Sequence, residues 1–195
     1  MKRGAVVGIV VALMAVSVAA CRKTANTDRA SAQAIPNAPV EGAEGPHGTN
    51  YRAPSGEFII QLPGTPEMRE EADGRTSYQL RTEDYAYTVN KLACPEEFAA
   101  DTDPKALYEK LQETVVAAVN GQAMSQYPLR SAGRRLWGRE LVVLARTPNT
   151  DERYEMVVRL FRDGDAVWLL QAIGPQAPQS RHDRVGVLDT FTLLE

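Results

Sequence analysis

The side chains that most often carry out catalysis are scarce in this chain. It contains two histidines and two cysteines, of which Cys94 and His182 lie in the part that is typical of a folded domain. A cysteine nucleophile needs a base to form its thiolate, so these two residues are a candidate dyad. The alternative is a buried cysteine at a strand end and a histidine on a solvated helix. The sequence gives no sign that the two residues are close, so it predicts no catalytic residue.

Motifs that would bind a cofactor or a metal are also missing. The chain has no Gly-x-Ser-x-Gly, no His-Glu-x-x-His, no Gly-rich phosphate loop and no Cys-x-x-Cys. Glu96, Glu97, Asp101 and Asp103 form an acidic stretch whose oxygens could hold Ca²⁺, but the EF-hand spacing and glycine are absent. Helix capping and solvation explain these acids better, because acidic residues favour a helix N-terminus. We therefore expect neither a cofactor nor a metal.

One cluster of residue types favours binding rather than catalysis. Four arginines surround a tryptophan in the stretch that contains Arg130, Arg134, Arg135, Trp137 and Arg139. Arginine and tryptophan are both favoured at binding hot spots, so the cluster could contact a protein or an anion. The alternative is a solvated hairpin end with Trp137 tucked into the core, since exposed charge near turns is common.

Composition narrows the class of protein. The chain is 44% hydrophobic and 24% charged over 195 residues, as in an ordinary globular domain with an appendage. Its net charge of −3 argues against a nucleic-acid partner, because such proteins carry a strong basic excess.

The first twenty-one residues have the order of a secretory signal. Lys2 and Arg3 precede an uncharged run rich in Val and Ala, which ends at Val18-Ala19-Ala20-Cys21. This ending resembles the lipobox of bacterial lipoproteins, although that family usually has Leu where Val18 stands. The resemblance implies cleavage before Cys21 and attachment of diacylglycerol to its thiol, so that residues 1–20 are a signal peptide. Two or more acyl chains would anchor the protein stably to a membrane.

Two alternatives for this segment remain. The uncharged run could stay as an uncleaved anchor, since its length is at the lower edge of a membrane-spanning helix. Ordinary signal peptidase could instead cut after Ala20 and release the protein. If the anchor forms, the domain faces the periplasm or the exterior. Arg22, rather than Asp, follows the cysteine, which by similarity to Gram-negative lipoproteins implies the outer membrane if the source is Gram-negative.

Residues 21–52 form the next region, a lipidated cysteine followed by a tether. From Arg22 to Arg52 the chain is rich in Ala, Pro, Gly, Asn, Thr and Ser, with few large apolar residues. So little apolar surface cannot offset the entropy of ordering the chain, which predicts a disordered linker. His47 falls within it, so we set this residue aside as a functional candidate.

Residues 53–195 then form one domain built mainly from strands. Alternating or apolar runs predict strands at Glu57–Leu62, Arg69–Ala72, Thr76–Arg81, Tyr85–Leu92, Gln126–Ser131, Trp137–Thr147, Arg153–Arg162 and Ala166–Ile173. Asp73-Gly74 and Asp163-Gly164 are strong signals for tight hairpins. The last strand is apolar on both faces, which indicates a central strand covered on each side. We therefore expect Trp168 in the core, against Leu107 or Leu111 of a helix or against the closing helix.

Two helices interrupt and close this series of strands. Apolar residues from Leu107 to Val119 recur at spacings of three and four, after a candidate N-cap at Asp103 and before a candidate C′ residue at Gly121. A terminal helix is expected within Gln179–Leu194, with Val185, Leu188 and Phe191 on its inner side. Consecutive hairpins with these helices predict an α+β fold, in which an antiparallel sheet packs against a central and a C-terminal helix.

This order of elements resembles the PsbP-like domain. The resemblance rests on Phe58–Pro63, the middle helix, the strand at Gly138–Leu141, the Arg-rich hairpin ending near Gly174-Pro175, and the closing helix with Phe191. It covers the chain from about Ser55 to the end and implies the PsbP-like fold. That family has no shared catalytic set, so the resemblance assigns no site residue and no photosynthetic role.

The function expected from these features is non-enzymatic. The chain would be a membrane-tethered envelope lipoprotein, anchored at Cys21, whose domain binds a protein or another envelope component. The alternative is a small-ligand carrier or an enzyme that uses a cleft between the sheet and a helix, which requires a concave apolar pocket with a few converging polar groups.

Overall fold

The strand that is apolar on both faces lies at the centre of a seven-stranded antiparallel sheet. The structure is a computed structural model, and it describes residues 41–71, 75–99, 104–134, 136–146 and 152–194. In spatial order, the sheet consists of β4 (Glu67–Glu70), β5 (Thr76–Arg81), β6 (Ala86–Ala93), β11 (Ala166–Pro175), β10 (Arg153–Asp163), β9 (Trp137–Arg146) and β7 (Gln122–Arg130). The predicted α+β architecture with an antiparallel sheet is therefore confirmed.

A second sheet of five short strands packs near the C-terminus. Its order is β1 (Glu44–Gly45), β2 (Gly48–Arg52), β3 (Phe58–Leu62), β12 (Thr192–Leu193) and β8 (Ala132–Gly133). The predicted closing helix ends earlier than expected, because β12 pairs with β3 and, in parallel, with β8. Strand β12, near the end of the domain, thus connects β3 with β8, which precedes β9 in the sequence.

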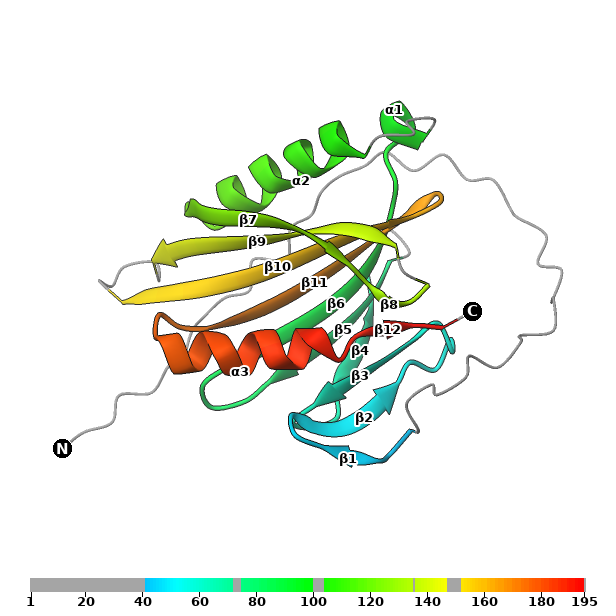
Figure 1. The fold of residues 1–195 in the computed structure, drawn as a ribbon, viewed down its shortest axis with the longest axis vertical. Helices are drawn as coiled ribbons and strands as arrows, with labels where there is room; N and C mark the ends of the chain where they lie inside the picture. The colour runs from blue at the N-terminus through cyan, green and yellow to red at the C-terminus, as the bar shows by residue number, and fades with distance from the viewer. Residues whose placement is uncertain (1–40, 72–74, 100–103, 135, 147–151, 195) are drawn as a thin grey trace, which may run out of the picture.

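Each face of the large sheet has its own apolar cluster, because successive strand residues point to opposite sides. Val167 and Leu169 face helix α2 (Lys105–Ala118) and belong to the same cluster as Leu107 of that helix. Trp168 and Leu170 face the small sheet and helix α3 (Pro178–Asp189). Figure 1 shows α2 on one side of the large sheet and α3 with β1–β3 on the other. This double cover explains the continuous apolar run in β11.

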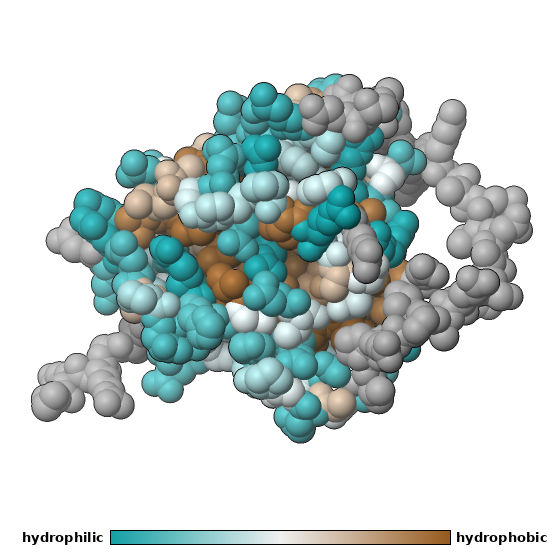
Figure 2. All heavy atoms as spheres, in the orientation of Figure 1, coloured by the Kyte–Doolittle hydropathy of each residue, from teal (hydrophilic) through white to brown (hydrophobic). Residues whose placement is uncertain are grey.

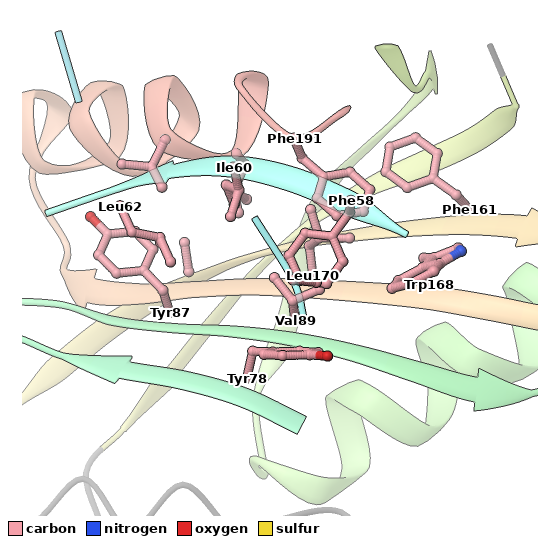
Figure 3. Packing of buried hydrophobic residues seen from close by; sticks show 14 of the residues in the cluster. Phe58, Ile60, Leu62, Tyr78, Tyr87, Val89, Phe161, Trp168, Leu170 and Phe191 are labelled. Atoms are coloured by element: carbon pink, nitrogen blue, oxygen red, sulfur yellow. The ribbon is translucent and has the colours of Figure 1, made fainter. Parts of the chain in front are cut away.

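Trp168 occupies the cluster on the α3 side. It is 2% exposed, and its ring lies edge-on to Phe58 at a centroid distance of 5.6 Å and 5.9 Å from the ring of Phe191 (Figure 3). Its predicted burial is confirmed. The alternative that placed it against Leu107 or Leu111 is wrong, because those side chains belong to the opposite face.

The ends of α2 differ in detail from the expectation. The left-handed residue after the helix is Asn120, with φ of 46°, and not Gly121. Gly121 serves a packing purpose instead, because a Cβ there would come within 2.7 Å of Val143 Cγ1 on β9. Asp103, the expected N-cap, lies outside the described residues. A short helix α1 (Glu96–Ala99) precedes α2, and no helix in the described part of the chain is long and apolar enough to cross a membrane.

The predicted start of the domain at Ala53 is wrong. Gly48–Arg52 forms β2, which pairs antiparallel with β3, and Glu44–Gly45 forms β1 beside it. Backbone hydrogen bonds and a few half-buried side chains such as Tyr51 hold this hairpin, so its composition does not reveal it. Residues 21–40 of the expected tether, including Cys21, lie outside the described residues.

Candidate functional site

The Arg/Trp cluster forms an exposed surface at one edge of the large sheet. Arg130 on β7 and Trp137 on β9 are direct cross-strand partners, and the guanidinium carbon of Arg130 lies 3.8 Å from the indole ring centroid. Trp137 is 58% exposed, so it is not tucked into the core. A guanidinium stacked on an exposed indole is a cation–π pair whose outer face remains available to a partner.

Arg139 extends this surface on the α2 side of the sheet. Its guanidinium donates a hydrogen bond of 2.9 Å to Gln126 Oε1 and lies 5.9 Å from the ring of Tyr108 on α2. The Tyr108 hydroxyl donates to the carbonyl oxygen of Trp137 at 2.8 Å, and burial raises the pKa of this phenol. The helix is therefore fastened to the strand that carries Trp137, which fixes the backbone beneath the surface.

The other two predicted arginines contribute differently. Arg134 is ion-paired with Asp163 at the end of β10, so its charge is already partly neutralised. Arg135 lies outside the described residues. We use the name Arg/Trp surface for Arg130, Trp137 and Arg139, with Arg134 at its margin.

Two exposed apolar residues that the sequence analysis did not single out lie on the same edge strand. Met124 and Tyr127 are large, exposed side chains of β7, and Met124 sits at an irregularity between Ala123 and Ser125. Figure 2 shows brown side chains gathered between α2 and α3, where the strands at this edge lie in Figure 1. Pro128 has no N–H to donate and so limits pairing of another strand with β7. The edge therefore favours contacts through side chains.

A cleft lies between α3 and the large sheet, where the alternative function places its ligand. Its volume is about 430 Å³, and its lining residues are Pro46, His47, Gly48, Pro63, Thr82, Glu83, Asp84, Tyr85, Tyr87, Asp183 and Val187. The Tyr85 hydroxyl donates to Asp183 Oδ2 at 3.2 Å, and burial raises the pKa of Tyr87 to about 12. Three carboxylates in this lining favour cationic rather than apolar ligands.

His47 is part of this cleft, which corrects its assignment to the tether. Its imidazole packs on α3 at Gly186, where any Cβ would overlap the ring. Its backbone N–H donates to Gln61 Oε1 at 3.4 Å. A histidine in a polar, glycine-rich segment offers no sequence signal for this position, because the contact depends on a glycine far away in the chain.

The Cys94–His182 dyad is contradicted by the fold. Cys94 is buried on the α2 face, and its N–H donates to the carbonyl oxygen of Asp165, just before β11 begins. His182 is on α3, which covers the other face and whose Arg184 contacts the carbonyl oxygen of Pro175, where β11 ends. The ten residues of β11 span about 30 Å, so the two side chains cannot exchange a proton.

The acidic stretch before α2 is only partly described. Glu96 and Glu97 occupy the first turn of α1, while Asp101 and Asp103 lie outside the described residues. Within the described ranges, no group of three or more His, Cys, Asp or Glu side chains could hold a metal ion.

A buried ion network joins α3 to the large sheet, and sequence reasoning did not find it. Glu155 on β10 accepts hydrogen bonds from Arg181 at 2.8 Å and from Arg184 at 2.7 Å. The side chain of Arg184 is 0% exposed, and burial lowers the pKa of its guanidinium. Arg181 and Arg184 are charged and lie in the predicted closing helix, so the sequence favours a solvated position for them. Their contacts fix α3 rather than form a reactive site.

Comparison with known proteins identifies the fold. The cyanobacterial PsbP (CyanoP) of Synechocystis sp. PCC 6803 matches with a TM-score of 0.52 at 10% identity, covering 78% of this chain and 98% of that one. The Saccharomyces cerevisiae Ran-binding protein Mog1p matches with a TM-score of 0.50 at 13% identity, covering 75% and 95%. LpqN of Mycobacterium tuberculosis, described as involved in cell envelope biogenesis, matches with a TM-score of 0.41 at 14% identity, covering 75% and 90%.

No protein-family model matches the sequence, and no curated protein matches it. The chain has the Mog1/PsbP-like fold, as its resemblance to the PsbP-like domain implies. At these identities the likeness is one of fold, and function has to be argued from the chain's own residues.

Proposed function

We propose that this chain is a lipid-anchored protein of a bacterial cell envelope whose folded domain binds a partner protein through the Arg/Trp surface. The observation that carries the binding proposal is the exposed Arg130–Trp137 stack, held in register by two paired strands. A contiguous exposed patch, more than an isolated apolar residue, marks an interaction site, and here the exposed Trp137 ring and the stacked Arg130 form one patch.

A protein partner fits this surface better than a small ligand does. Trp and Arg are among the residue types most enriched at hot spots of protein interfaces, and both are present here. The surface lies along a strand edge, a shape that suits a broad contact. Mog1p, whose fold is similar, is described as Ran-binding, so this fold can serve as a protein-binding module. The identity of that partner does not transfer.

The anchor is proposed from the sequence alone. A basic start, an apolar run and Val18-Ala19-Ala20-Cys21 support lipidation of the cysteine thiol, and with it a membrane-attached domain in the periplasm or at the cell surface. Replacing Cys21 with Ser removes the thiol that takes the diacylglycerol. Metabolic labelling with a clickable fatty acid should mark the wild type and leave Cys21→Ser unmarked. Equal labelling of both would rule out the anchor.

The binding surface is tested by site-specific crosslinking in cells. A photoreactive amino acid placed at position 137 should crosslink to one partner of discrete mass. The matched control is position 68 on β4, because Met68 is also exposed, at 50%, but lies on the opposite edge of the same sheet. Arg130→Ala, which removes the stacked cation, should weaken the adduct at position 137. Equal adducts at positions 137 and 68 would contradict a specific surface.

A further inference from the structure

A second pocket lies between the two sheets, at the end where β11 begins. Its volume is about 350 Å³, and it is lined by Ser55, Glu57, Arg75, Thr76, Tyr78, Lys91, Leu92, Ala93, Asp165, Ala166 and Trp168. It is separate from the Arg/Trp surface, which lies on the α2 side of the sheet, and from the cleft beside α3. Its walls combine a few polar groups with Tyr78, Ala93 and Ala166, as in sites for small molecules.

The wall of this pocket contains a buried hydrogen-bond donor that lacks an acceptor. Trp168 is 2% exposed, and its Nε1 has no hydrogen-bond partner among the described residues. Figure 3 shows this nitrogen pointing away from Phe58 and Leu170, toward the end of the sandwich where β11 begins. A buried N–H without an acceptor is destabilising and rare, so its presence beside a cavity calls for an explanation.

A cation lies next to the same indole. The ammonium nitrogen of Lys91 is 5.4 Å from the centroid of the Trp168 ring and is ion-paired with Glu57, the residue before β3 of the small sheet. Both side chains of this pair are about 40% exposed, at 41% and 39%, so solvent and solutes reach them. An ammonium group has three N–H donors, so Lys91 can hold Glu57 and a further acceptor at the same time.

We propose that this pocket binds small monocarboxylates with an apolar body. One carboxylate oxygen accepts the N–H of Trp168, Lys91 supplies the opposite charge, and the apolar body lies against Tyr78 and Ala166. An acceptor is required by the indole, and a negative charge is favoured by the ammonium. Arg75, Glu57 and Asp165 also line the pocket, so its two cations are balanced by two carboxylates, which disfavours ligands with two or more negative charges.

Nitrogen-15 spectra of the full chain report on this contact directly. The chain has two tryptophans and so gives two indole N–H resonances, and Trp168→Phe assigns them by removing one. Benzoate is the probe, and benzyl alcohol is the matched neutral control. We expect benzoate to shift the Trp168 resonance in a saturable way, while benzyl alcohol does not, and the exposed Trp137 resonance serves as an internal reference.

Three variants test the assigned roles by calorimetric titration with benzoate. Trp168→Phe keeps an aromatic ring but removes the donor, and should weaken binding about tenfold or more, since hydrogen bonds to charged groups are strong. Lys91→Gln should also weaken it. Glu57→Gln removes the competing carboxylate and should tighten binding about threefold, as expected for a partly exposed charge. A role limited to holding the two sheets together would not produce this gain. Far-ultraviolet circular dichroism confirms that each variant is folded.

Several results would overturn the proposal. If benzoate leaves the Trp168 resonance unchanged, the pocket does not bind this class of ligand. If benzyl alcohol shifts the Trp168 resonance equally, the indole N–H donates to a neutral partner as readily as to a carboxylate, and the pocket is not selective for carboxylates. If Glu57→Gln binds benzoate no more tightly than the wild type, Lys91 does not supply the charge. None of these results bears on crosslinking through the Arg/Trp surface.

Discussion

Removing the Trp168 ring is expected to destabilise the domain far more than removing the Trp137 ring. Truncation of a buried Trp to Ala costs about 3–5 kcal/mol through lost transfer energy and a cavity. At Trp168 the cavity would open between Phe58 and Phe191, whose rings lie 5.6 and 5.9 Å from it. The change also removes the buried Nε1, and an unsatisfied donor costs about 1–3 kcal/mol. Taking the midpoint of each range, the net loss for Trp168→Ala is therefore about 2 kcal/mol.

A loss of this size is measurable by thermal melting. For a domain of this length, each kcal/mol lowers Tm by about 2–4 °C, so Trp168→Ala should melt roughly 4–8 °C below the wild type. Trp137→Ala loses an exposed cation–π pair of about 0.5–1 kcal/mol and should shift Tm by only about 1–4 °C. If Trp168→Ala melts like the wild type, the central position of β11 is wrong. A drop for Trp137→Ala as large as that for Trp168→Ala would mean that its ring supports the core.

Three further outcomes follow from other parts of the fold. Glu155→Gln should lower the free energy of unfolding in urea by about 3–5 kcal/mol, because the buried Arg184 loses its counter-charge; no loss would mean that solvent reaches this pair. Burial raises the pKa of Tyr87 from 10.0 to about 12. The stability that the neutral phenol contributes is therefore complete below pH 10 and is lost, by about 2–3 kcal/mol, as the pH rises toward 12. Tyr87→Phe should reduce this loss of stability between pH 10 and 12 in pH-dependent melts. Trypsin should cut at Arg29 well before Arg52, which is in β2, and early cleavage at Arg52 would contradict the pairing of β2 with β3.

The parts of the fold that sequence predicted are those with local or periodic signals. Hairpins at Asp163-Gly164 and the alternation of Tyr85, Tyr87 and Val89 need only neighbouring residues, and both are confirmed. The apolar run at Val167–Leu170 records burial on two faces, which is a property of the strand itself. Amphipathic spacing likewise located α2 to within a few residues.

Features that depend on distant partners were missed or misplaced. The hairpin of β1 and β2 is polar because the edge of a small sheet is stabilised largely by backbone hydrogen bonds to β3. His47 reaches α3 only because Gly186 leaves room for its ring. Charge alone suggested a solvated position for Arg184. A guanidinium can be buried only when a carboxylate such as Glu155 reaches it, and no spacing in the sequence links Arg184 to Glu155.

The sequence placed the candidate binding residues together but could not decide whether Trp137 faces solvent. Gly138 fixes the face of the sheet on which Trp137 lies. Successive residues of β9 point to opposite faces, so a position that faces the α3-side cluster lies between Trp137 and Arg139. At that position any Cβ would overlap Phe161, whose ring stacks on Phe191 at a centroid distance of 6.1 Å. The strand therefore packs tightly against the core and holds both of its outer side chains on the α2 side.

Rigid support of this kind favours binding through the Arg/Trp surface. Gly138 packs β9 onto Phe161 from beneath, and the Tyr108 hydroxyl holds the backbone of Trp137 from α2. Arg130 is in turn placed over the indole by the register of β7 with β9. A side chain whose backbone is already ordered loses less conformational entropy when a partner contacts it. The exposed indole is thus presented by the packed sheet and not by a loop, which is the arrangement expected of a preorganised binding surface.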